Sequence, residues 1–100
     1  MAEISVSSLP QEQLERICEV AEEAVRGYIA SRVPSRGISN LMIAIDLKGA
    51  QTLTVDVDVE VTLSPLLRSL NVEELVNKAV KAAFEAVEGY LRENGCQYKV

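Results

Sequence analysis

Histidine and tryptophan are absent from the 100-residue sequence, and aromatic residues make up only 4% of it. Without histidine, the chain lacks the usual proton shuttle of neutral pH, the base of Ser-His-Asp and Cys-His pairs, and the ligand of most zinc sites. Few aromatic side chains also means few surfaces on which single-stranded bases could stack. We therefore expect a protein that is not an enzyme and that binds no metal or cofactor.

Cysteine, basic charge and long apolar runs are also scarce. The two cysteines, Cys18 on an apolar helix face and Cys96 in a polar tail, suggest free thiols and not a disulfide. No apolar signal segment follows Met1, and no run is long enough to span a bilayer. The net charge of −5 disfavours general contact with a phosphate backbone. We expect a cytoplasmic protein with no membrane role, in which nucleic acid is bound only indirectly or through a local basic patch.

What the sequence does contain is aliphatic side chains in regular patterns. Hydrophobic residues form 48% of the chain, enough for one domain, residues 1–100, with a single aliphatic core. A capping box with Ser8 as N-cap and Gln11 closing it, and with Pro10 in the first turn, predicts the start of a helix that runs to about Val33. Pro34 ends it. Apolar residues recur at helical spacing along it: Leu14, Ile17, Cys18, Ala21, Ala24, Val25, Tyr28 and Ile29.

Two strands follow, and both place odd-numbered apolar residues on one face. These are Leu41, Ile43, Ile45 and Leu47, then every second residue from Leu53 to Leu63. Opposed residues of an antiparallel pair share a face, so the turn needs three or five residues or a bulge. The simplest case places Leu47 opposite Leu53. Residues 2–7 alternate weakly and are a candidate third, N-terminal strand.

A second helix begins at an Asn71 cap, with Glu74 closing the capping box, and ends at Asn94-Gly95. The predicted fold class is α+β in the order α-β-β-α, an antiparallel hairpin packed on two long antiparallel helices. The apolar arc of the second helix covers roughly 200°, wider than one neighbour requires. A hairpin is also narrow for two helices and has two open edges. We therefore expect a partner, a second copy or another small protein, at a surface formed by Val80, Phe84, Val87 and Leu91.

The two helices share a similar heptapeptide, residues 23–29 and 85–91, each with an interior glycine. Glycine destabilises a helix interior by about 1 kcal/mol. One hypothesis is close helix–helix approach at Gly27 and Gly89, with Tyr28 and Tyr90 near the crossing. Chance similarity between two helices rich in alanine and glutamate is the alternative.

Two polar groups are candidate binding surfaces. Arg32, Arg36 and Arg68 should gather near the Asn71-capped helix start, where an anion or RNA backbone could bind, although Arg32 also suits a helix C-terminus by itself. The outward strand face carries acidic side chains about 6.8 Å apart along one strand, too far apart to clasp one ion. We interpret this face as solvated or facing a basic partner; its residues are Asp46, Asp56, Asp58 and Glu60.

Several segments resemble known families. Residues 27–31, the strand from Thr54 to Leu63, and Leu63-Ser64-Pro65-Leu66 resemble an archaeal family of small α+β proteins of unknown function. Genes of that family often neighbour the prefoldin beta subunit gene, and the resemblance implies a hairpin between two helices. More remotely, residues 38–91, with Leu47-Lys48-Gly49 and Ser64-Pro65-Leu66-Leu67-Arg68, resemble the small Pcc-type subunit of KEOPS, the complex that makes threonylcarbamoyladenosine in tRNA.

The second resemblance implies a non-catalytic accessory subunit that forms dimers and contacts a catalytic subunit. This sequence departs from the Pcc-type subunit in its weak first strand and its longer opening helix. The sequence thus predicts a protein-interaction subunit, and the resemblance implies a Pcc-like member of an archaeal KEOPS complex. The alternatives are an RNA-binding module that uses the three arginines, and a chaperone-associated archaeal protein.

Overall fold

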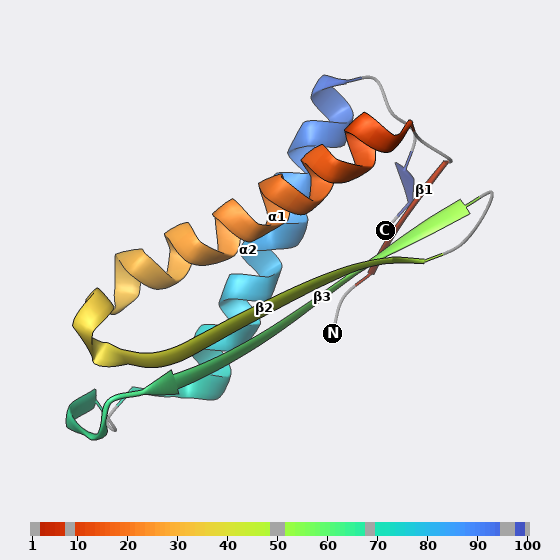
Figure 1. Ribbon diagram of the computed structural model, residues 1–100. Helices are drawn as coiled ribbons and strands as arrows, with labels where there is room; N and C mark the ends of the chain where they lie inside the picture. The colour runs from red at the N-terminus through yellow and green to blue at the C-terminus, as the bar shows by residue number, and fades with distance from the viewer. Residues whose placement is uncertain (1–2, 8–9, 49–51, 68–69, 95–97, 100) are drawn as a thin grey trace.

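The computed structural model describes residues 3–7, 10–48, 52–67, 70–94 and 98–99, and it has two helices on one face of an antiparallel sheet (Figure 1). The helices are α1 (Gln11–Arg32) and α2 (Val72–Glu93), and two short 3-10 turns are η1 (Ser35–Gly37) and η2 (Pro65–Leu67). The strands are β1 (Glu3–Ser7), β2 (Ile38–Lys48), β3 (Thr52–Leu63) and β4 (Tyr98–Lys99). The predicted α+β fold, with its α-β-β-α order, is confirmed.

Helix α1 begins two residues later than the predicted capping box requires. Pro10, not Ser8, is the N-cap, and its carbonyl accepts hydrogen bonds from the backbone N–H groups of Gln13 and Leu14 at 3.0 and 3.1 Å. Proline fixes φ near the helical value, so it can start a helix without a side-chain cap. Ser8 itself lies outside the described residues. The predicted end is confirmed, because Arg32 is the last helical residue and Val33 is extended.

The hairpin β2–β3 has the predicted parity but not the simplest register. Ile43 pairs with Val59 and Leu47 with Val55, so inward residues of both strands are odd-numbered. Pairing of Leu47 with Leu53 is wrong by two residues. A slip of two keeps every side chain on its face, so the hydrophobic pattern cannot choose between these registers. The turn at residues 49–51 lies outside the described part of the chain.

The sheet has more strands than the hairpin alone, in the order β2-β3-β1-β4. The candidate N-terminal strand is confirmed as β1, which pairs antiparallel with β3 from Thr52 to Asp56. The two-residue strand β4 pairs with β1 and was not predicted. Since β1 is short, it covers only the end of β3 nearest the hairpin turn (Figure 1).

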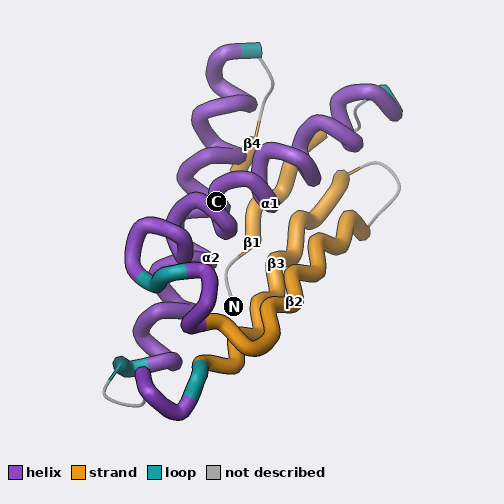
Figure 2. The backbone as a smooth tube through the Cα atoms, turned by 60° about the vertical axis from the view of Figure 1, so that its left-hand side comes forward, coloured by secondary structure: helices purple, strands orange, loops and turns teal. Residues whose placement is uncertain are grey.

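Helix α2 has the predicted ends. The Asn71 side chain accepts a hydrogen bond from the Glu74 backbone N–H at 3.0 Å, which satisfies one of the free donors of the first turn. At the other end, Asn94 is the C-cap and its side-chain amide donates to the Tyr90 carbonyl at 2.8 Å. Helices α1 and α2 run in opposite senses and cross over the sheet (Figures 1 and 2).

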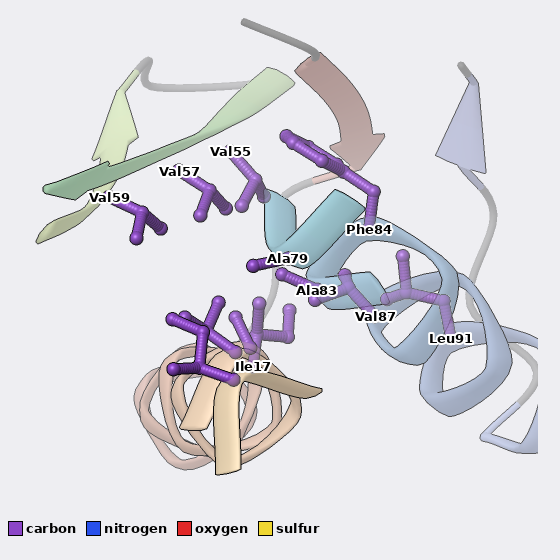
Figure 3. Close-up of a cluster of buried hydrophobic side chains, with 12 residues drawn as sticks. Ile17, Val55, Val57, Val59, Ala79, Ala83, Phe84, Val87 and Leu91 are labelled. Atoms are coloured by element: carbon purple, nitrogen blue, oxygen red, sulfur yellow. The ribbon is translucent and has the colours of Figure 1, made fainter. Parts of the chain in front are cut away.

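The core lies between the helices and the inner face of the sheet (Figure 3). It is almost entirely aliphatic, as expected from the composition. Its buried members are Ile17, Ala21, Val25 and Ile29 of α1, Val55, Val57 and Val59 of β3, and Ala79, Ala83, Phe84, Val87 and Leu91 of α2. The inward residues of β2 are only half-buried, so the helices cover the middle of the sheet better than this edge.

The hypothesis that the helix glycines permit close approach is wrong. A Cβ atom built on Gly27 or Gly89 would have no heavy atom within 4 Å beyond its chain neighbours and its own helix backbone. Small residues at the crossing are instead alanines, since Ala21, Ala79 and Ala83 are all fully buried. The repeated heptapeptide therefore marks no contact that requires glycine.

Candidate functional site

The clearest surface feature is a groove between β3 and α2. Strand β3 pairs with β2 on one side. On its other side, the pairing with β1 reaches only as far as Asp56, which is opposite Glu3, so no described strand pairs with Val57–Leu63 there. Helix α2 passes beside this free segment (Figure 1). The result is a hollow with a cavity volume of about 600 Å³, one wall of which is an unpaired strand edge. We call it the β3–α2 groove; it is lined by Val57, Asp58, Val59, Val76, Asn77, Val80, Lys81, Phe84, Glu85 and Glu88.

The groove is apolar inside and acidic at its rim. Val57, Val59 and Phe84 belong to the core, and Val76 and Val80 pack half-buried against it. Three carboxylates, Asp58, Glu85 and Glu88, face one basic side chain among the lining residues, Lys81. A ligand that fills this groove would remove water from its apolar side chains, and the acidic rim favours positive charge on that ligand.

The four residues expected at a partner interface divide into two pairs. Val80 and Phe84 line the groove. Val87 and Leu91 lie inside the protein's own core with 0% exposure, so they belong to the monomer and not to an outer surface (Figure 3). The wide apolar arc of α2 is explained in part by this chain, because α2 packs against both α1 and β3. At the groove, Val76 and Val80 are half-buried and Phe84 is buried at 6% exposure.

Two of the three arginines of the predicted cluster, Arg32 and Arg36, lie in the described part of the chain. The Arg32 guanidinium stacks over the Tyr28 ring at 5.2 Å, and Tyr28 lines a hollow of about 190 Å³ together with Asn71. Arg36 lines a different hollow of about 180 Å³, beside Ser64 and the 91% exposed Leu66. Arg68 lies outside the described residues.

The start of α2 already holds its own charges. The Glu74 carboxylate accepts a salt bridge from Lys78 Nζ at 2.7 Å, and the hydrogen bond and charge of Lys78 lower the pKa of Glu74. Glu73 adds a second carboxylate to the same turn. Because these acids complement the helix dipole, they oppose a bound phosphate at this helix start.

The four acidic residues of the strand face lie on the outer side of the β2–β3 hairpin, although the Asp56 side chain is only 17% exposed. Asp46 and Asp56 are directly opposed across the hairpin, and Lys48 Nζ lies 3.6 Å from an Asp56 carboxylate oxygen. Asp58 and Glu60 are exposed on a sheet face that no helix covers (Figure 2). Within the described ranges, no group of three acidic or cysteine side chains is placed to hold a metal ion.

Cys18 is the one described thiol, and its surroundings do not activate it. Burial raises the pKa of the Cys18 thiol above its ordinary value of 9.0, and the charges of Glu15 and Glu19 raise it further. A reactive cysteine requires the opposite shift, toward thiolate at neutral pH. Cys96 lies outside the described residues. Neither described helix is both long and apolar enough to cross a membrane.

Comparison with known proteins identifies one family and several archaeal relatives. The profile of a family described as "Protein of unknown function (DUF3194)" matches residues 6–90. An uncharacterised protein of Pyrococcus furiosus is 28% identical over 89% of this chain and 79% of its own length. An uncharacterised protein of Thermococcus kodakarensis is 26% identical over 90% of this chain and 82% of its own.

Two solved structures have the same fold. A crystal structure from Thermococcus onnurineus superimposes with a TM-score of 0.78 and 25% identity, over 94% of this chain and 92% of that one. The solution structure of a hypothetical protein from Methanothermobacter thermautotrophicus gives 0.73 and 24% identity, over 86% and 92%. The resemblance to a small archaeal α+β family is therefore confirmed.

Proposed function

Because the chain belongs to the family described as "Protein of unknown function (DUF3194)", whose name assigns no activity, we propose a function from the surface of this protein itself. The protein is a non-catalytic protein-binding module, and its partner occupies the β3–α2 groove. The observation that carries the proposal is a partly apolar hollow of about 600 Å³ between α2 and Val57–Val59, which lie in the segment Val57–Leu63 that no described strand pairs with on that side. Exposed strand edges and apolar grooves are two features by which folded domains bind other chains.

The absence of catalytic chemistry supports the same proposal. The sequence has no histidine, and the one described thiol, Cys18, has a raised pKa. A nucleophile activated by a histidine base is therefore excluded by the sequence. Function then depends on which chain the surface recognises.

The first partners to test come from the resemblance of residues 38–91 to the small Pcc-type KEOPS subunit. An accessory subunit of that complex would bind another small subunit and leave the chemistry to the catalytic one. The expected experiment mixes the purified protein with each KEOPS subunit, and separately with the prefoldin beta subunit. Size-exclusion chromatography with light scattering then measures the mass of any complex.

The groove is tested with one disruptive variant and one matched control. Val80→Arg places a charged, bulky side chain in the groove, and because Val80 is only half-buried, the guanidinium can reach solvent. Glu93→Lys changes the charge of an exposed residue in the last turn of the same helix, outside the groove lining. Circular dichroism confirms that both variants remain folded.

Affinity purification of the tagged protein from archaeal cells extends the test to partners outside KEOPS. We expect one identified protein in stoichiometric amount with the wild type and with Glu93→Lys, and its loss with Val80→Arg. Recovery of equal amounts with Val80→Arg would exclude the groove. Recovery of RNA in place of protein, with release by ribonuclease, would favour the RNA-binding alternative through Arg32 and Arg36.

A further inference from the structure

We propose that the groove receives an extended segment of the partner, which adds to the sheet as a strand along Val57–Leu63 and alternates aliphatic with basic side chains. This inference rests on the proposed function and specifies its ligand. It commits to a strand, and not to a helix or a folded surface, because the backbone edge forms one wall of the groove.

The backbone argument begins with β1. This strand pairs with Thr52–Asp56 and then ends, although β3 continues for seven further residues. Along that continuation, half of the backbone N–H and C=O groups point away from β2, with no described strand to bind them. A partner segment paired with these residues would satisfy these groups, and where it pairs with Val57–Val59 it would lie over the groove.

The side-chain argument follows from the pleat. Successive side chains of an added strand point to opposite faces of the sheet. On the helix side they would meet Val76, Val80 and Phe84, which selects aliphatic residues. On the outer side they would lie beside Asp58 and Glu60, which selects lysine or arginine.

The rim of α2 reinforces this charge preference. Glu85 and Glu88 line the groove on the helix side, so a basic segment meets carboxylates from two elements. Opposite charges across an interface favour encounter and fix register, and both effects weaken with salt.

A second copy of this chain fits the edge poorly. Each chain carries a net charge of −5. A symmetric antiparallel pairing centred on Val57–Leu63 would place Glu60 opposite its own counterpart. Like charges directly opposed across strands are destabilising. The edge is therefore better suited to a basic partner segment than to self-association.

The test uses a synthetic peptide of alternating lysine and valine that is long enough to pair with all seven residues of Val57–Leu63. Binding to the isotopically labelled protein is followed by nuclear magnetic resonance, with amide hydrogen exchange measured in the presence and absence of peptide. The expected result is slower exchange at alternate amides within Val57–Leu63, with chemical-shift changes at Val80 and Lys81. A peptide of alternating glutamate and valine should not bind.

Three comparisons separate the contributions of charge and of backbone hydrogen bonds to peptide binding. The double variant Glu85→Lys, Glu88→Lys should weaken binding roughly tenfold at low salt, since a tenfold change corresponds to the loss of about two modest ion pairs. Glu93→Lys should change it less than about twofold, as expected for a surface charge outside the site. A lysine–valine peptide methylated at alternate backbone nitrogens should lose affinity, because it cannot donate to the edge.

The remaining outcomes overturn the inference in distinguishable ways. Equal binding of the methylated peptide, or shifts on α2 with no protection of Val57–Leu63, would refute strand addition while leaving the groove as a binding site. Protection of β2 residues instead would assign the ligand to the other edge. Protection that depends on protein concentration without peptide would identify a second copy as the occupant. Absence of binding, together with a partner complex sensitive to Val80→Arg, would reject the strand and retain the proposed function.

Discussion

Replacement of Gly27 and Gly89 by alanine is expected to stabilise the protein. Both glycines lie inside long helices, where glycine is less favourable than alanine because it loses more backbone entropy on folding. Beyond its chain neighbours and its own helix backbone, a Cβ at either position would have no heavy atom within 4 Å, so no close contact offsets that loss. The methyl groups would enter open space without displacing a neighbour.

The magnitude follows from helix propensity. Each substitution should raise the free energy of unfolding by about 0.5–1 kcal/mol. If the two effects add, as they do for sites without shared contacts, the double variant gains about 1–2 kcal/mol. For a domain of this size each kcal/mol raises Tm by roughly 4–8 °C. Urea titration followed by far-ultraviolet circular dichroism measures the gain, with an unchanged slope against urea expected.

Gly37→Ala is the matched control with the opposite sign. Gly37 is buried in η1, and a Cβ there would overlap the Leu67 side chain. We expect this variant to be less stable than the wild type because Leu67 must move. The reasoning would be refuted by a double variant, Gly27→Ala with Gly89→Ala, that is less stable than the wild type. That result would mean that something packs on these glycines in solution.

Four further outcomes are expected. Asn71→Ala removes the cap of α2 and should lower the free energy of unfolding by about 1 kcal/mol, with Asn71→Ser close to wild type in the same urea titration. In a Cys96→Ser background, Cys18 should react with iodoacetamide more slowly than a free thiol at pH below 9.0, because its pKa is raised; an equal rate would contradict the burial argument. The same shift predicts that stability falls as pH rises above 9.0, since the unfolded thiol ionises first. Asp46→Thr should stabilise by about 0.5 kcal/mol, less at high salt, by removing a like charge opposite Asp56.

The regular elements were predictable because each follows one period. Residues 53–63 alternate without exception, and the structure buries Val55, Val57 and Val59 as the alternation requires. Helix α2 carries both its period and its cap signal, and Asn71 caps it as predicted. Patterns of this kind depend on which face of the element is buried, and this face can be recognised from the spacing of neighbouring residues in the sequence.

The features that sequence reasoning missed depend on tertiary contacts. The two residues of β4 are too few for any period, and they form a strand only because β1 is beside them. The hairpin register shifts by two residues without moving any side chain to the other face. The helix glycines suggested close packing. However, the whole apolar arc of a helix decides which side meets its neighbour, and the small residues buried on that side are alanines.

The groove was predicted only in part. Val80 and Phe84 were predicted at an interface, but no role was predicted for Lys81, Glu85 or Glu88. Their spacing was the available signal: residues 81, 85 and 88 form one stripe on α2, adjacent to the apolar stripe of 76, 80 and 84. A charged stripe beside an apolar one indicates a rim, but only the end of β1 at Asp56 reveals the wall opposite it.

The charge along the free edge explains how the protein can leave it unpaired. An exposed, apolar strand edge pairs readily with other chains, and charged side chains are one means by which proteins prevent this. Asp58 and Glu60 lie on the segment that β1 does not cover, so two copies of the edge repel each other. The same carboxylates attract a basic segment. A single feature therefore keeps the edge open against self-association and selects the chemistry of its partner, which is why the acidity and the missing strand are best interpreted together.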